Sequence, residues 1–478
     1  MAELESVERG SAPSHGRTPP IESSSPETNV ESTSPTPGAS WGTRREAATA
    51  AVILAVIATT LVFTIATRGV KFSIYDEASH FDYAVKVAHG HVPRGGELFS
   101  RKVMELWSCR GQVLYPSGVP PCRSGAPATA YPAYGINYNY IQPPLYYAIT
   151  GPAAIAISKM TGINLFTAAR GLGAGWLFLA MFGMYLVLRY WRVAFGYALT
   201  GGILLATFEM VVHLSSFVTT DAVATLCGVG AFFVLGRIVV HQRYGCVLPV
   251  AFATAAAATK TISAVAYLVV AAVILVIGLA EWRRDTFSSA LPKLRTAALV
   301  LSSVAVVHVS WTLIQAARTP AGYVSPIHGQ NTRAILGSPF GEWLPTLPTG
   351  FSLGAGMYLD PVVDGPYLAG WTTALTTLVA ASSFVALAVF ARRTPEWIAG
   401  CTLFLGCLSY PLLVQLESYT ADNSYFPVVT QRYGITFIPM AVGCLIFIAA
   451  ERGLKLTSRV VTGVGLGIIT LTTFGLLS

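Results

Sequence analysis

Runs of about twenty apolar residues recur along most of the chain and are separated by short polar stretches. A helix needs about 20 apolar residues to cross the hydrocarbon core of a bilayer. The pattern therefore predicts an all-α polytopic membrane protein with about eleven transmembrane helices. The expected spans are residues 47–67, 171–188, 194–213, 219–238, 246–259, 262–280, 296–316, 370–391, 396–414, 433–450 and 459–477.

One further apolar run, residues 143–160, is ambiguous because prolines at 143, 144 and 152 interrupt it. If this run does not cross, the cytoplasmic loops hold thirteen Lys and Arg residues, and the later outer loops hold four. Lys and Arg collect in cytoplasmic loops. We therefore expect residues 143–160 to lie along the outer surface and the chain to end outside.

Residues 1–43 are rich in Ser, Pro, Thr and Glu and lack apolar periodicity. Such a segment cannot bury enough surface to fold, and we expect a disordered cytoplasmic tail. Arg44 and Arg45 precede the first apolar run, which is too long for the hydrophobic part of a signal peptide. We expect a signal anchor in the plasma (inner) membrane, with the N-terminus in the cytoplasm. This topology predicts two long outer loops, residues 68–170 and 317–369.

Charged residues make up 11% of the chain, the mean hydropathy is +0.57 and the formal net charge is +8. The basic residues are spread over helix ends and form no basic cluster with interleaved aromatic residues. The positive charge is therefore an orientation signal, and the composition gives no indication of nucleic-acid binding.

Cys109 and Cys122 both fall in the first outer loop, on the side where disulfides persist, and we expect them to pair. Two free thiols in a mobile loop are the alternative. The other cysteines lie in or beside apolar runs and are expected to be packing residues. They are Cys227, Cys246, Cys401, Cys407 and Cys444.

Several ionisable residues fall at the outer ends of the predicted spans, where exposure to lipid is unfavourable. Their shared depth predicts one polar cavity, although each of them alone could simply anchor a helix end. They are Arg170, Glu209, His213, Asp221, Lys260, His308 and Arg432. A cavity at headgroup level with cations at its rim suits a lipid phosphate, because guanidinium and ammonium groups pair strongly with phosphate.

Asp76 and Glu77 are adjacent carboxylates at the start of the first outer loop. Asp76 is our candidate general base toward an acceptor hydroxyl. Three alternatives stay open. In the first, the two acids only cap a short helix. In the second, Asp76 and His80, four residues apart, bind a metal together with His89 or His91. In the third, Asp82 is the base and projects from a different face of the helix.

The order and sidedness of several motifs resemble the GT-C superfamily of lipid-phosphate-sugar glycosyltransferases. The closest pattern is that of the protein O-mannosyltransferases, the aminoarabinose transferases and related bacterial membrane proteins. The motifs are DExxHFxY from Asp76, PPLYY from Pro143, an Arg at 170, VTTDA at 218–222, ATKT at 258–261 and QRYGITFIP at 431–439.

The resemblance implies a GT-C-like fold with a large first extracytoplasmic loop. It divides the chain into the tail (1–43), a catalytic membrane core (44–290) that includes the loop 68–170, and C-terminal helices (291–478) that include the loop 317–369. It also implies an inverting glycosyltransferase that moves a sugar from a polyprenyl-phosphate donor to a hydroxyl acceptor on a glycan, lipid or protein of the envelope. No cofactor and no metal site are predicted.

The resemblance also implies residue roles. Asp76 is the catalytic residue and Glu77 its orienting neighbour, while Lys260, Arg432 and Arg170 bind the donor phosphate. The substrate cavity is expected to include His80, Gln142, Tyr146, Asp221 and Tyr433. Gln142 stands where the aminoarabinose transferases carry a Lys, which shifts phosphate binding onto the other three cations.

Functions of two other classes remain alternatives. A secondary transporter or lipid flippase fits the helix count, but transporters show internal repeats and ionisable residues near the midplane, and we find neither here. A catalytically inactive scaffold of an envelope-assembly complex is the third possibility.

Overall fold

The computed structural model describes residues 43–68, 71–112, 118–353, 366–451 and 463. The predicted tail and the last predicted span, 459–477, therefore lie almost wholly outside the described residues. Most described residues are helical, and seven helical segments are long and apolar enough to cross a membrane. The chain is thus a multi-pass helical membrane protein. The seven segments are Arg44–Thr67, Leu165–Tyr190, Thr220–Val239, Thr261–Arg284, Phe287–Arg318, Pro395–Asp422 and Gln431–Glu451.

The expected number of eleven spans is not reached among the described residues. The run 194–213 folds as two helices, α7 (Phe195–Leu205) and α8 (Glu209–Ser216), with a bend of 62° between them. The pair is an eighth span if the two helices are taken as one. Two further runs are found among the described residues as shorter apolar helices, α10 (Val247–Thr259) and Thr376–Val389 within α14 (Pro366–Val389).

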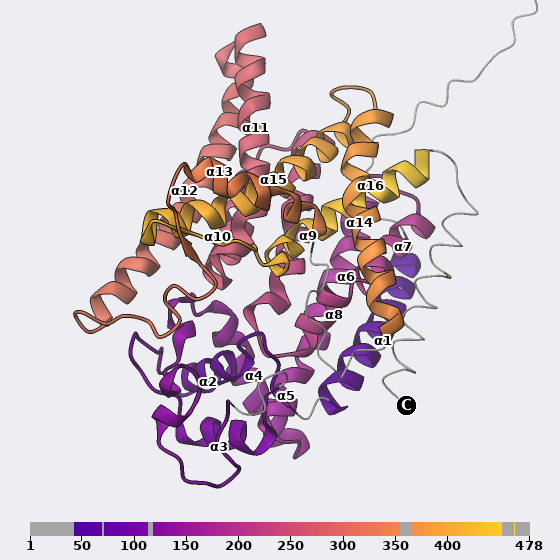
Figure 1. The fold of residues 1–478 in the computed structure, drawn as a ribbon. Coiled ribbons are helices and arrows are strands. Elements are labelled where there is room, and N and C mark those ends of the chain that lie inside the picture. Colours follow the sequence, from indigo (N-terminus) through magenta and orange to yellow (C-terminus); the bar gives the residue numbers. More distant parts are fainter. Residues whose placement is uncertain (1–42, 69–70, 113–117, 354–365, 452–462, 464–478) are drawn as a thin grey trace, which may run out of the picture. The chain divides into compact units, whose positions relative to one another are not determined.

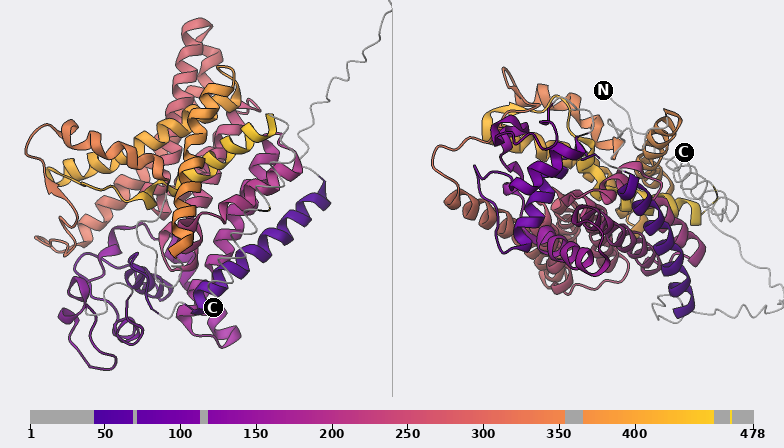
Figure 2. Two further views of the ribbon diagram at one scale, coloured as in Figure 1. Left: turned by 45° about the vertical axis from the view of Figure 1, so that its right-hand side comes forward. Right: turned by 90° about the horizontal axis from the view of Figure 1, so that it is seen from below.

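The first helix, α1 (Arg44–Arg68), begins with a reciprocal capping pair. The Glu46 backbone N–H donates to Thr43 Oγ1 at 3.2 Å, and the Thr43 N–H donates to Glu46 Oε2 at 2.9 Å. This arrangement satisfies backbone donors that a helix start leaves without partners. The helix then packs along α6 (Gly173–Tyr190), which continues from α5 (Leu165–Gly171) (Figures 1 and 2).

The predicted loop 68–170 folds into short helices beside α5 (Figure 1). They are α2 (Glu77–Ala88), α3 (Arg101–Arg110), η1 (Ala128–Ala130), η2 (Pro132–Gly135), η3 (Tyr138–Ile141) and α4 (Leu145–Thr161). Helix α4 is not among the segments long and apolar enough to span, but it continues through Pro152, which we expected to interrupt it. It packs on α2 so closely that a Cβ at Gly151 would lie 2.1 Å from the Ala84 carbonyl oxygen.

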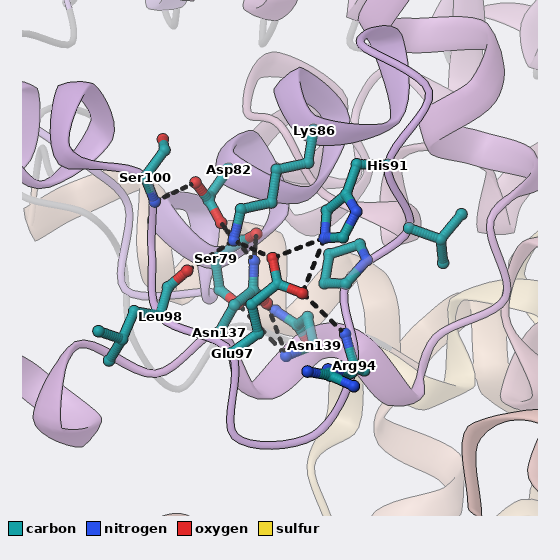
Figure 3. A network of polar contacts seen from close by, with 12 residues as sticks. Ser79, Asp82, Lys86, His91, Arg94, Glu97, Leu98, Ser100, Asn137 and Asn139 are labelled. Carbon is teal, nitrogen blue, oxygen red and sulfur yellow. Dashed lines mark hydrogen bonds and ion pairs between the residues drawn. The ribbon is translucent and has the colours of Figure 1, made fainter. Parts of the chain in front are cut away.

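A buried polar network fixes α2 to the rest of this region (Figure 3). Asp82 accepts hydrogen bonds from the Ser100 N–H at 2.8 Å and from Asn137 Nδ2 at 2.9 Å, and its carboxylate lies 3.0 Å from Lys86 Nζ. Lys86 also pairs with Glu97 at 2.8 Å. Cys109 and Cys122 are joined by a disulfide. These contacts fix the position of α2, at whose start Asp76 lies.

The predicted outer loop 317–369 includes a segment that packs along a helix. Its residues 343–352, which we call the descending segment, run from the end of α13 (Pro339–Trp343) through η6 (Leu344–Ser352). The Trp343 ring lies 5.8 Å from that of Tyr419 in α15 (Pro395–Asp422). Further along, Tyr410 Oη donates to the Thr349 carbonyl at 2.8 Å.

Gly350 lies against the Cys407 carbonyl, which a Cβ at that glycine would approach to 1.7 Å. The descending segment thus follows α15 from Tyr419 to Cys407, about 18 Å of helix. It also packs against η7 (Gln431–Phe437), which opens the last described helix, α16 (Ile438–Glu451).

The remaining elements complete the described fold. A two-residue antiparallel pairing joins β1 to β2, with Arg333 opposite Tyr425. The elements not yet named are η4 (Thr220–Val223), α9 (Ala224–Val239), η5 (Thr261–Ala264), α11 (Val265–Arg284), α12 (Phe287–Arg318), β1 (Arg333–Ala334) and β2 (Ser424–Tyr425).

Candidate active site

Asp76 occupies an unusual backbone position at the start of α2. It is the N-cap residue, with φ of 59° in the left-handed region, and its side chain makes no capping hydrogen bond. Its carboxylate instead accepts a hydrogen bond from Tyr138 Oη at 3.0 Å on Oδ1, and Arg432 Nη2 lies 3.3 Å from Oδ2. Strained residues of this kind cluster at functional sites. The helix-capping alternative therefore does not describe Asp76.

Three membrane helices present charged residues to the same place through short 3-10 turns. Asp221 lies in η4 before α9, Lys260 caps η5 before α11, and Arg432 lies in η7 before α16. The turn η5 packs against η7, and ion pairs join Lys260 and Arg432 in these two turns to Asp221 in η4. The shared depth predicted from the sequence thus brings Asp221, Lys260 and Arg432 together.

The charged side chains form one chain of ion pairs with Asp76. Lys260 Nζ lies 2.6 Å from Asp221 Oδ1, and Arg432 Nη1 lies 3.9 Å from Asp221 Oδ2. Arg432 then reaches Asp76. Tyr433 covers both cations, with its ring centroid 5.3 Å from Lys260 Nζ and 5.6 Å from the Arg432 guanidinium carbon. We call the four charged residues the ion-pair chain.

Glu77 and Arg170 form a separate, buried ion pair. Arg170 donates from Nε and Nη2 to the two Glu77 oxygens at 2.7 and 2.6 Å, and both side chains are fully buried. Glu77 also accepts from the backbone N–H groups of Ser73 and Val218. Arg170 is therefore paired with a buried carboxylate, whereas its contact with the donor phosphate and the role of Glu77 in orienting Asp76 stay predictions.

His80 follows Asp76 by one helical turn and is almost fully buried. Its Nδ1 lies 2.7 Å from Tyr147 Oη. Burial lowers the pKa of His80 to about 3, although the Asp76 carboxylate opposes this shift. His80 is thus neutral at physiological pH and does not compete with the two cations for an anion.

Tyr138 was not singled out in the sequence, where it is one of several tyrosines before Pro143. Burial, the neighbouring Asp76 charge and the hydrogen bond to it raise the pKa of Tyr138 well above its usual range. The phenol therefore stays protonated and remains a donor to Asp76 Oδ1.

An apolar cavity of about 430 Å³ opens beside the ion-pair chain. Thr259, which precedes Lys260, and Tyr146 are among its lining residues. The cavity follows α9 from Val223, two residues after Asp221, to Phe233, about 15 Å of helix. A molecule with an anionic head and a long apolar tail would fit this combination of charge and cavity.

The other predicted cavity residues lie at the edges of this site. Gln142 is half-buried, and its backbone carbonyl accepts from Tyr83 Oη at 3.0 Å. His213 lies 3.3 Å from Ser73 Oγ, on the side of the Glu77 pair. His308 Nδ1 lies 3.3 Å from Thr261 Oγ1, next to Lys260 in the chain.

Two alternatives for the chemistry do not fit the geometry. Asp82 is fully buried and bound by three partners, so it is not a base for an external hydroxyl. His91 pairs with Glu97 at 2.8 Å, and His89 bonds the Val85 carbonyl. In the part of the chain that the structure describes, no three His, Cys, Asp or Glu side chains come together as a metal site.

The fold and site define a multi-pass helical membrane protein with an ion-pair chain and an apolar cavity that is lined by residues next to Asp221 and Lys260 in the chain. Among solved structures, the chain is similar to ArnT from Cupriavidus metallidurans, crystallised with bound undecaprenyl phosphate. The TM-score is 0.47 and the identity 17%, over 87% of this chain and 63% of ArnT.

This chain therefore spans less than two thirds of the length of ArnT. The likeness is too low to transfer any residue role. No protein-family model and no curated protein sequence matches the chain.

Proposed function

We propose that this protein is an inverting glycosyltransferase that moves a sugar from a polyprenyl-phosphate donor to a hydroxyl acceptor on the extracytoplasmic side of the plasma membrane. One observation carries the proposal: a partly exposed carboxylate, Asp76, pairs with Arg432, which leads through Asp221 to Lys260, and an apolar cavity reaches the residues next to Asp221 and Lys260 in the chain. The acceptor is a glycan, a lipid or a protein of the envelope.

The donor's two ends match the two parts of the site. The phosphodiester binds Lys260 and Arg432, because charge-assisted hydrogen bonds to phosphate are strong and Arg presents two parallel donors. The first isoprene units enter the cavity lined by Tyr146, Thr259 and α9. Burying an apolar chain there removes hydrocarbon from the crowded headgroup level and fixes the depth of the phosphate.

The reaction is a displacement at the anomeric carbon. The acceptor hydroxyl gives its proton to Asp76 while its oxygen forms the new bond to the anomeric carbon. The bond from that carbon to the phosphate oxygen breaks, and its electron pair leaves with the polyprenyl phosphate. Lys260 and Arg432 stabilise the charge that develops on the leaving phosphate. A single displacement inverts the configuration, and no carboxylate nucleophile is needed.

The test uses purified full-length protein and undecaprenyl phosphate carrying radiolabelled mannose, glucose or arabinose in turn. Release of undecaprenyl phosphate is measured with envelope extract as acceptor source and with water alone, because slow hydrolysis reports the same base without a known acceptor. We expect release with at least one donor, and its loss in Asp76→Asn.

The matched control is Asp422→Asn, because Asp422 is 30% exposed, as Asp76 is, and also lies near one basic side chain, that of His328, at 3.4 Å. Release that survives Asp76→Asn removes Asp76 as the base. Movement of the lipid between leaflets without release supports a flippase, and binding with neither supports a scaffold.

A further inference from the structure

The cations near Asp76 differ in how firmly they are held. Lys260 lies 2.6 Å from Asp221, and Arg170 lies 2.6 Å from Glu77. Arg432 is held more loosely, at 3.3 Å from Asp76 and 3.9 Å from Asp221. Among the described residues, neither Arg432 Nε nor Asp221 Oδ2 has a hydrogen-bond partner, although both atoms are buried. Arg432 also lies over the rings of Tyr75 and Tyr433, and these contacts do not involve Asp76. Among the three cations, Arg432 therefore has the longest carboxylate contacts to exchange.

Exposure within the ion-pair chain places the loose pair at its accessible end. The side chains of Asp76 and Arg432 are 30% and 15% exposed, whereas those of Lys260 and Asp221 are 9% and 2% exposed. An entering anion thus meets the Arg432–Asp76 pair before it meets the Lys260–Asp221 pair.

The charges of the empty site balance, since two carboxylates face two cations. A phosphodiester adds one negative charge, and its oxygens compete with Asp76 for the same guanidinium. A bidentate contact between Arg and phosphate is stronger than one contact at 3.3 Å. Phosphate binding therefore favours transfer of Arg432 from Asp76 to the ligand.

We propose that Arg432 masks Asp76 in the empty site and releases it when the donor phosphate binds; this inference rests on the proposed function. Tyr138 keeps its hydrogen bond to Oδ1 during the exchange, so the carboxylate stays oriented. Oδ2, the oxygen that Arg432 leaves, then accepts the proton of the acceptor hydroxyl.

This exchange sets an order of binding. The donor binds first, because Asp76 becomes a competent base only once the phosphate holds Arg432. The leaving polyprenyl phosphate keeps Arg432 until it departs, after which the guanidinium returns to Asp76. Arg432 is thus a positioning residue that couples the two substrates.

The test measures labelling of Asp76 by dicyclohexylcarbodiimide, which reacts with protonated carboxyl groups. A carboxylate released from a guanidinium takes up a proton more readily. The full-length protein is labelled at a fixed mildly acidic pH with and without saturating undecaprenyl phosphate, which carries no sugar. Labelled peptides are quantified by mass spectrometry, binding of the lipid is measured separately, and Asp422 serves as the internal reference.

We expect the lipid phosphate to raise labelling of Asp76 at least threefold in the wild type and to leave Asp422 unchanged. In Arg432→Gln, labelling should be high already and insensitive to the lipid. Lys260→Gln is the matched comparison, since it removes a cation that does not touch Asp76. It should weaken lipid binding without raising labelling in the empty protein.

Two results would overturn the exchange. One is lipid binding in the wild type with unchanged or lower labelling of Asp76, and the other is low labelling in Arg432→Gln. Either leaves the proposed function intact. Failure of the wild type to bind undecaprenyl phosphate removes the proposed function itself, and this inference with it.

Discussion

Arg170 and Arg432 carry the same charge but differ in burial and in partners. Arg170 is fully buried, meets Glu77 through two short hydrogen bonds, and lies between the rings of Phe166 and Phe217. Arg432 remains partly exposed beside Asp76. A guanidinium enclosed in this way is a structural element, whereas one with a loose, exposed partner is available to a ligand.

Replacing Arg170 by Gln should therefore destabilise the fold. Removal of one partner leaves the Glu77 carboxylate buried and without its counter-charge, which costs about 3 to 5 kcal/mol. The unfolding midpoint in detergent should fall clearly. Arg101→Gln is the control, because Arg101 and Glu105 form an exposed pair worth about 0.5 kcal/mol. An Arg170→Gln protein that unfolds like the wild type but no longer binds undecaprenyl phosphate would restore the sequence-based role of Arg170.

For the charged residues of the site, the sequence predicted their positions along the helices better than it predicted which residues pair with each other. Asp221, Lys260 and Arg432 share a depth because each lies at the outer end of an apolar run, and depth can be counted from the sequence. The pairing of carboxylates with cations depends on the packing of helices that are far apart in the chain. For that reason the sequence did not indicate the pair of Arg170 with Glu77, and Tyr138, one of several tyrosines in its segment, was missed.

The descending segment is the element that departs most from the sequence-based expectation. Its LPTLPTGFS sequence has two prolines and fewer apolar residues than a span needs, so hydropathy assigns it to a loop. Contacts with α15 decide its course instead. Gln415 Nε2 donates to Thr346 Oγ1 at 3.2 Å, which satisfies a polar group beside the helix. Such irregular backbone is tolerated at membrane depth only where protein covers it.

Gly350→Ala should displace this segment. The added Cβ would lie 1.7 Å from the Cys407 carbonyl oxygen, so one backbone must move, and overpacking of this kind costs about 1 to 3 kcal/mol or more. Gly337→Ala is the control, because a Cβ there meets open space. The unfolding midpoint should fall for Gly350→Ala only. Equal midpoints for the two variants would show that the descending segment does not pack on α15.

The link between α2 and residues 91–98 should weaken in acid. Partial burial opposes the shift, but hydrogen bonds from Lys86 and His91 and their charges hold the pKa of Glu97 below its usual value of 4.5. A depressed carboxyl pKa stabilises the fold above the unfolded value, and this stabilisation is lost as pH falls through the folded pKa.

Glu97→Gln should therefore flatten the dependence of the unfolding midpoint on pH below about 4.5. Glu105→Gln, which removes an exposed carboxylate, should keep the wild-type dependence. Identical pH profiles for Glu97→Gln and the wild type would contradict the role of Glu97.

For the molecule as a whole, the site depends on both halves of the predicted division at residue 290. Asp76, Asp221 and Lys260 come from the first part, and Arg432 comes from the second. The turns that open α11 and α16 pack together, and Lys260 and Arg432 in them pair with Asp221 in the turn that opens α9, so these three helices begin at the same end of the bundle. The alternation of spans in the sequence predicted this common end, which the charge bias assigns to the outside.

Cysteine labelling tests that orientation. A membrane-impermeant maleimide should label Lys102→Cys in intact cells, because Lys102 lies exposed in α3 of the first loop. Arg283→Cys, exposed at the end of α11, should be labelled only after permeabilisation. The parent protein with its native cysteines gives the background. The reverse pattern would place the ion-pair chain in the cytoplasm and contradict an extracytoplasmic reaction.

The role of Asp76 as the general base is tested by measuring the reaction and the binding of the donor lipid separately in Asp76→Asn. Release of undecaprenyl phosphate from a glycosylated donor should fall at least 100-fold, because the general base is lost. Undecaprenyl phosphate should bind at least as tightly as to the wild type, since the carboxylate that competes for Arg432 is gone. Release at the wild-type rate, or equal loss of release and binding, would contradict the assignment of Asp76 as the base of a lipid-phosphate-dependent transferase.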